Sequence, residues 1–251
     1  MGKWLHAFFN AQVFLTRIPA PPGIRYEKED LNRATVFFPL IGAGVGSLCA
    51  LVFWLSHMVW PHSVAVAVSM IFSLLLTGAF HEDGLADVCD AFGGGWEKNQ
   101  ILTIMKDSRI GTFGTVGLVS ALGLKWLCLN TMSSEKVILS LIAAHSLSRW
   151  AATLIVFAGK PVPERVQEKP KPMATKLSGM QWAAATVFAL GFGSLLGWLH
   201  GLIAAGLSVV FAFWLYRYYC RWIGGYTGDG LGTIQQVSEL GIYLVAIASL
   251  W

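Results

Sequence analysis

Charged side chains are scarce in this chain: Asp, Glu, Lys and Arg make up 13% of its 251 residues. A soluble domain normally carries about twice that fraction. Hydrophobic residues account for 55% of the sequence, 11 residues are tryptophan, and the mean hydropathy is +0.59. The scarcity of charge therefore excludes an ordinary soluble domain and predicts a polytopic membrane protein.

Cysteine patterns and nucleotide-binding loops are absent as well. The four cysteines show no C-x-x-C spacing, so we expect reduced, structural thiols and no zinc site. The sequence contains no P-loop, no dinucleotide-binding fingerprint and no nucleophile elbow. It also lacks nucleic-acid-binding motifs, and membrane topology explains the net charge of +4, so we expect no nucleic-acid partner.

The chain does contain hydrophobic runs long enough to span a bilayer. We expect an all-α fold with about seven transmembrane helices in one membrane-embedded catalytic domain over residues 1–251. The candidate spans are Val36–Met58, Val64–Phe80, Thr112–Asn130, Val137–Phe157, Gln181–His200, Leu202–Tyr218 and Thr233–Trp251. Before them, Trp4, Phe8 and Leu15 alternate with polar residues, which predicts an N-terminal helix lying in the membrane interface.

Basic residues settle the expected orientation. Fifteen of the 18 Lys and Arg residues fall in four alternate segments: 1–35, 81–111, 159–180 and 217–232. Because cytoplasmic connections carry the excess of positive charge, these four segments should face the cytoplasm and the C-terminus should lie outside.

An acidic cluster directly follows the second apolar run. If the segment is helical, Asp83, Asp87 and Asp90 share one face at i, i+4 and i+7, with Glu82 beside them. Clustered carboxylates repel one another unless a cation relieves them, and an oxygen-only ligand set suits Mg²⁺ or Mn²⁺. The alternative is a solvated helical turn that is merely acidic.

The same predicted connection continues with the segment Met105–Gly114. Lys106 and Arg109 can neutralise phosphate oxygens, and Gly111 and Gly114 permit close approach of an anion to the start of the next helix. The alternative is that Lys106 and Arg109 only anchor a membrane helix. Next to the carboxylates, we favour phosphate binding.

Two further features carry charge near the same face. The segment Gly224–Gly232 has five glycines around Asp229, which predicts either a tight turn or a contact to metal, ribose or base. Arg149 lies inside a predicted span, where a guanidinium needs a partner; we expect an anionic substrate or a carboxylate, the alternative being snorkelling toward the cytoplasm. These parts together suit phosphoryl-group transfer at a membrane surface.

At these residues the chain resembles the cobalamin synthase family, adenosylcobinamide-GDP ribazoletransferase, nearly from end to end. The motifs that carry the resemblance are TRIPAP (Thr16–Pro21), FFPLIGAGVG (Phe37–Gly46), FHEDGLADVCDAF (Phe80–Phe92), MKDSRIGTFG (Met105–Gly114), SRW (Ser148–Trp150), TGDGLG (Thr227–Gly232) and SELG (Ser238–Gly241). The combination of DGLADxxD, KDSRxG and TGD is more specific than any single motif.

The resemblance implies a multi-pass enzyme of the bacterial inner membrane that is active on the cytoplasmic face. The sequence leaves open whether it forms a homo-oligomer. The resemblance also implies transfer of the adenosylcobinamide-phosphate group from adenosylcobinamide-GDP to α-ribazole or its 5′-phosphate, with release of GMP and use of Mg²⁺. We expect the ribazole 5′-oxygen to attack and Asp87 or Asp90 to act as base. The implied metal ligands are Asp83, Asp87, Asp90 and Glu82, and the residues expected at the substrate are Lys106, Asp107, Arg109, Arg149 and Asp229.

Two other functions remain as alternatives. A CDP-alcohol phosphotransferase also uses aspartates at a helix end, but its DGxxAR signature is absent: Asp83 and Gly84 are followed by Ala86 and Asp87, and no Ala-Arg pair closes the motif. A transporter would concentrate charges near the middle of the bilayer, whereas the charges here gather at one face.

Overall fold

The computed structural model describes residues 2–24, 28–163 and 174–248, and in them the chain is helical with one isolated bridge between Pro161 and Tyr226. The helices are α1 (Lys3–Leu15), α2 (Lys28–Ala34), α3 (Phe38–His57), α4 (His62–Thr77), α5 (Phe80–Gly94), α6 (Lys98–Ile104), α7 (Thr112–Asn130), α8 (Ser134–Ala158), α9 (Gly179–Gly193), α10 (Trp198–Trp222) and α11 (Gly228–Ile247), with short 3-10 turns η1 (Thr35–Phe37) and η3 (Ser194–Leu196). The expected all-α fold is confirmed.

Five helical segments of the described chain are long and apolar enough to cross a membrane, or six if α4 and α5 form one bent span. The expected count of about seven is therefore high. The predicted last span, Thr233–Trp251, corresponds to α11, which falls short because Gln235, Gln236 and Glu239 interrupt its apolar sequence. Residues 249–251 of that prediction lie outside the described residues.

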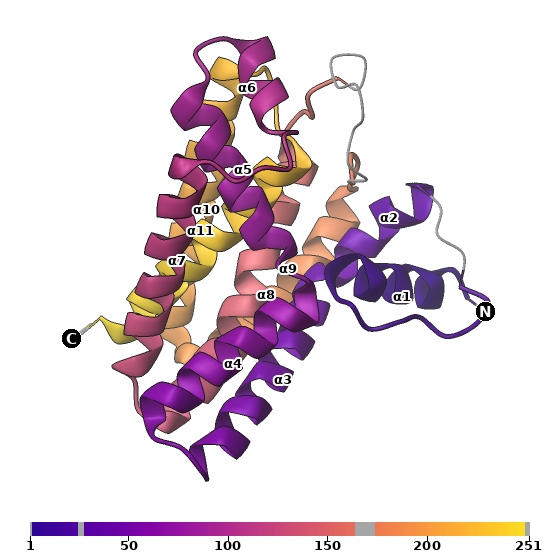
Figure 1. Cartoon of the computed structure of the whole chain (residues 1–251). Coiled ribbons are helices and arrows are strands. Elements are labelled where there is room, and N and C mark those ends of the chain that lie inside the picture. Colours follow the sequence, from indigo (N-terminus) through magenta and orange to yellow (C-terminus); the bar gives the residue numbers. More distant parts are fainter. Residues whose placement is uncertain (1, 25–27, 164–173, 249–251) are drawn as a thin grey trace.

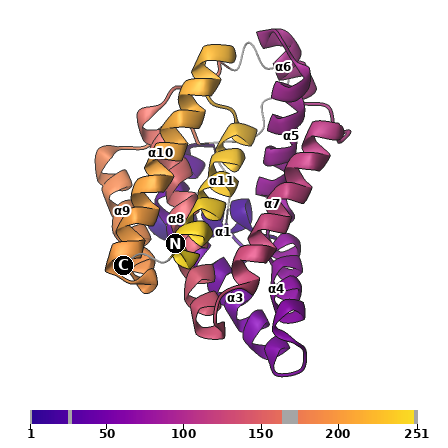
Figure 2. The same cartoon turned by 90° about the vertical axis from the view of Figure 1, so that its left-hand side faces the viewer.

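Helix α8 is the centre of the bundle. Most of it is buried, and it packs against α3, α11, α9 and α10 (Figure 2). Close contact with α3 depends on small residues: a Cβ on Gly42 would lie 2.9 Å from Arg149 Cδ, and one on Gly46 would lie 2.7 Å from Ile142 Cα. Such glycine spacing is a common way for helices to approach closely in a bilayer.

The chain turns sharply between α4 and α5. Gly78 and Ala79 both have left-handed backbone angles, with φ of +68° and +54°, and the two helices meet at 87°. The predicted span Val64–Phe80 thus ends at Thr77, and the acidic segment begins a helix in a new direction (Figure 1).

Helix α1 runs crosswise to α3 and α8 beside the end of α3 (Figure 1). It buries Ala7, Ala11 and Leu15 while Trp4 and Val13 stay exposed, as expected for an interfacial helix. Helix α6, the end of α10 and the start of α11 gather at the end of the molecule opposite the connection between α3 and α4 (Figure 2). The basic segments 81–111 and 217–232 extend to this end, whereas the basic segment 1–35 contains α1 and α2, and Thr175 donates to Asn32 of α2.

Candidate active site

The acidic face lies on α5, directly after the bend. Asp83 is exposed, and Asp87 and Asp90 are half-buried. These three side chains share one face of the helix, as the spacing predicts. Glu82 does not join them: it is 6% exposed and accepts a hydrogen bond from Gln236 Nε2 of α11 at 3.1 Å.

Asp90 holds the start of α7. The backbone N–H of Gly111 donates to Asp90 Oδ2 at 2.7 Å, and that of Gly114 donates to Oδ1 at 2.8 Å. A Cβ on Gly111 would lie 2.5 Å from Asp90 Oδ1. The two glycines therefore admit a carboxylate of the protein itself, which occupies the helix N-terminus where we expected a phosphate.

The segment Gly224–Gly232 brings Asp229 to α5. Thr227 caps α11 by accepting a hydrogen bond from Gly230 N at 3.1 Å, which leaves Asp229 in the first turn. A Cβ on Gly84 would lie 3.0 Å from the Asp229 carbonyl oxygen, and the Thr233 hydroxyl donates to the carbonyl oxygens of both Gly84 (3.1 Å) and Asp229 (3.0 Å). Close helix contact thus sets Asp229 beside the acidic face, and its expected contact to metal, ribose or base stays a prediction.

The loop before α7 carries the predicted phosphate-binding residues on its surface. Arg109 pairs with Asp107, its Nη2 lying 2.6 Å from Asp107 Oδ2. This guanidinium lowers the pKa of Asp107 to about 2, so the pair stays charged through the physiological range. Lys106 is exposed and has no ion pair among the described residues, which makes it the more available cation of the two.

A buried polar network lies deeper in the bundle, and sequence reasoning missed most of it. Lys125 of α7 forms an ion pair with Glu239 of α11, which also accepts hydrogen bonds from Gln235 Nε2 (2.7 Å) and Tyr243 Oη (3.1 Å). The sequence does contain a signal for this network, because an isolated Lys and an isolated Glu in membrane helices each require a partner.

Among the described residues Arg149 forms no ion pair with a carboxylate, and its expected pairing with an anionic substrate stays a prediction. Its Nη1 lies 3.1 Å from His145 Nδ1 and donates to the His145 carbonyl oxygen at 3.0 Å, one turn earlier on α8. The side chain is 2% exposed and points into the bundle, so it does not snorkel. Arg149 and Asp229 nevertheless line the same pocket, so part of the predicted site is assembled.

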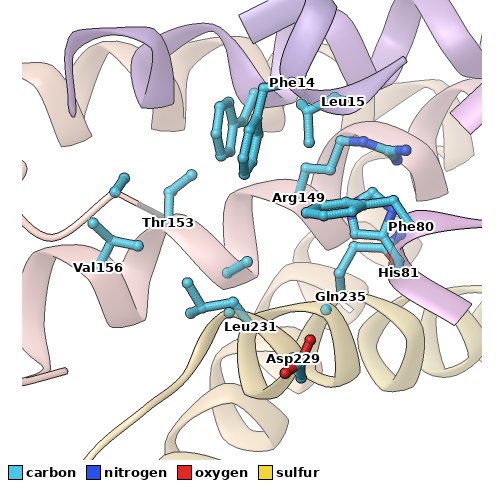
Figure 3. A pocket seen from close by; sticks show the side chains of 15 residues that line it. Phe14, Leu15, Phe80, His81, Arg149, Thr153, Val156, Asp229, Leu231 and Gln235 are labelled. Carbon is cyan, nitrogen blue, oxygen red and sulfur yellow. The ribbon is translucent and has the colours of Figure 1, made fainter. Parts of the chain in front are cut away.

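That pocket lies between α1, α3, α5, α8 and α11 and has walls made mainly of apolar side chains (Figure 3). In Figure 3, Phe80, His81 and Arg149 lie at one end, Thr153 and Val156 at the other, and Asp229 and Leu231 along the α11 side. We call it the apolar pocket; its lining residues are Phe14, Leu15, Phe38, Phe80, His81, Arg149, Ala152, Thr153, Val156, Ala174, Gly228, Asp229, Leu231, Gly232 and Gln235.

Comparison with protein families matches residues 7–247 to the family described as Cobalamin-5-phosphate synthase. The chain belongs to this family. Three similar relatives are each named adenosylcobinamide-GDP ribazoletransferase. They come from Shewanella frigidimarina (41% identity; 98% of this chain and 97% of the relative), Shewanella amazonensis (43%; 98% and 96%) and Ralstonia pickettii (45%; 93% and 92%). No solved structure matches this chain.

The predicted acids of this cobalamin synthase family member do not form a closed metal cage. Among the described residues, no three His, Cys, Asp or Glu side chains converge in a group able to hold a metal ion. The donor chemistry still fits Mg²⁺, because this ion is commonly held by one or two carboxylates together with substrate phosphates. Asp83 and Asp87, one turn apart on the outer face of α5, are such a pair.

Proposed function

We propose that this protein transfers the adenosylcobinamide-phosphate group from adenosylcobinamide-GDP to a ribazole acceptor, releasing GMP, at the cytoplasmic face of the bacterial inner membrane. Family membership and the relatives' names support the reaction class. The observation that carries the assignment to a site is the contact between Gly84 and Asp229, which joins the acidic face of α5 to the apolar pocket.

Asp83 and Asp87 are the residues that would hold Mg²⁺ together with diphosphate oxygens. When bound, the ion would supply charge neutralisation at the transferred phosphorus and at the leaving GMP. Asp90 serves differently in this proposal, since each of its oxygens already accepts a backbone N–H. We leave Glu82 out of the proposed metal site, because its buried carboxylate accepts a hydrogen bond from Gln236 of α11.

The remaining polar residues would bind and orient the reactants. Exposed Lys106 is suited to the charge on the leaving phosphate, while Arg109 is partly neutralised by Asp107. Asp87 is the better candidate than Asp90 to accept the proton of the attacking hydroxyl, because Asp90 is committed to the N-terminus of α7.

The attacking oxygen depends on whether the acceptor carries a phosphate. The family description names a cobalamin-5-phosphate, so its product retains a phosphate at the 5′ position. A 5′-oxygen that already carries phosphate is not available as a nucleophile, so with a phosphorylated acceptor another oxygen must attack. We propose that a secondary ribose hydroxyl attacks the corrinoid-side phosphorus, and that the bond from this phosphorus to the GMP oxygen breaks.

Turnover by the purified full-length protein in liposomes tests this proposal. Adenosylcobinamide-GDP and α-ribazole 5′-phosphate should give GMP and a corrinoid product with Mg²⁺ and neither product with EDTA. Asp83→Asn and Asp87→Asn should each lower kcat/KM by at least about a hundredfold, because each removes a charged ligand. Glu135→Gln, an exposed acid at the start of α8, is the matched control and should keep wild-type turnover.

Two results would contradict the proposal. Full activity of Asp83→Asn and Asp87→Asn would refute the metal assignment, and turnover of a CDP-activated lipid in place of the corrinoid would favour the phospholipid enzyme. The transporter alternative gains little from the buried charges, because Lys125 and Glu239 neutralise each other.

A further inference from the structure

The apolar pocket is built from aromatic rings at its α1 side. Phe14 stacks on Phe38 with ring centroids 5.6 Å apart and planes at 12°, and it meets Phe80 edge-on at 5.2 Å. These three rings come from α1, α3 and α5, so the pocket wall depends on the packing of the interfacial helix against the bundle. Aromatic faces and edges of this kind are well suited to contact another flat ring.

The polar side chains of the pocket are mostly engaged with other parts of the protein. The Thr153 hydroxyl donates to the Trp150 carbonyl oxygen at 2.7 Å, and Gln235 Nε2 donates to Ser148 Oγ at 2.9 Å. Arg149 donates through Nη1 to the His145 carbonyl oxygen, while its buried Nε has no partner among the described residues. Apart from Arg149, the pocket therefore has few polar groups to offer a ligand over most of its wall. The formally charged residues of its lining are Arg149 at one end and Asp229 beside the acidic face.

We propose that the apolar pocket binds the flat base of the acceptor nucleoside, with the ribose at Asp229 and the attacking hydroxyl toward Asp87. This inference rests on the proposed function and assigns one of its substrates to a place. A ribazole base is a benzimidazole: two fused apolar rings with a single free ring nitrogen as acceptor. Such a base loses few hydrogen bonds when it leaves water for an apolar wall.

Two competing occupants fit less well. The guanine of the donor carries ring N–H, amino and carbonyl groups along its edges, and burial against Phe14, Phe38 and Val156 would leave them unpaired at a substantial cost. A lipid acyl chain would satisfy the aromatic wall but would bring hydrocarbon against the charged Asp229 carboxylate.

The direct test measures binding of α-ribazole to the full-length protein in nanodiscs, by equilibrium dialysis without donor. Ala152 is a half-buried lining residue of α8, and Ala152→Phe fills the pocket. We expect this variant to weaken ribazole binding at least about tenfold while the affinity for adenosylcobinamide-GDP stays at the wild-type value. Ala184→Phe makes the same change on the exposed side of α9 and should alter neither affinity.

A second variant keeps the test decisive if Ala152→Phe does not fold. Phe80→Ala enlarges the pocket and should raise kcat/KM for the riboside of a bulkier, three-ring base relative to α-ribazole by about tenfold. An unchanged ratio, a loss of donor affinity in Ala152→Phe, or wild-type ribazole binding in folded Ala152→Phe would each overturn the inference. Ribazole binding is measured without turnover, so failure of the proposed reaction would appear separately as absence of GMP release by the wild-type protein.

Discussion

Asp87 and Asp90 stand one turn apart on α5, yet the fold gives them different partners. Both oxygens of Asp90 accept N–H groups at the start of α7, whereas Asp87 lies on the helix face toward Asp83. Sequence spacing predicts their shared face but not this division, because the amides that Asp90 holds are more than twenty residues further along the chain.

Replacing Asp90 with Asn should therefore act first on stability. The amide keeps one acceptor but turns an NH₂ group toward a backbone N–H, so we expect a loss of about 1–2 kcal/mol in the free energy of unfolding. Hydrogen exchange at Gly111 and Gly114 should accelerate. Mn²⁺ affinity, measured by electron paramagnetic resonance with the diphosphate donor present, should stay near wild type, in contrast to Asp87→Asn. Normal stability with lost Mn²⁺ binding would make Asp90 a metal ligand after all.

At the scale of helices, the sequence predicts the apolar segments well and their ends poorly. Hydrophobic runs located every strongly apolar helix. The 87° bend after α4 was not predicted, because it depends on left-handed angles at Gly78 and, against intrinsic preference, at Ala79. The polar residues of α11 were visible, but their burial depends on which helices surround them.

The contact between α3 and α8 gives a test at this scale. A methyl group at Gly46 would lie 2.7 Å from Ile142 Cα, so Gly46→Ala should separate the two helices and cost about 1–3 kcal/mol of stability. Gly44→Ala is the control on the same helix, since nothing lies within 4 Å of its Cβ position. Unfolding of both variants by SDS titration in mixed micelles measures the difference; equal stabilities would mean that the α3–α8 packing is looser than described.

At the scale of the whole molecule, the sequence does not predict which distant polar residues pair across the bundle. Lys125 and Glu239 are separated by more than a hundred residues, and Glu82 meets Gln236 at a similar separation. The sequence identifies each of these four residues as a polar side chain in an apolar segment. Which of them pair depends on how α5, α7 and α11 pack together. The network joins the three helices that carry the candidate site.

Lys125→Met tests whether this network is held together by charge compensation. Removing the ammonium leaves Glu239 buried with the donors Gln235 and Tyr243 and with His145 Nε2 3.8 Å away, and we expect a loss of about 3–5 kcal/mol in unfolding free energy. The double variant Lys125→Met, Glu239→Met removes both charges at similar volume and should recover most of that loss. Recovery of stability with normal GMP release would identify the pair as structural. A double variant as unstable as the sum of the two single variants would mean that each residue has its own indispensable partners, and that the pair is not the unit that joins α7 to α11.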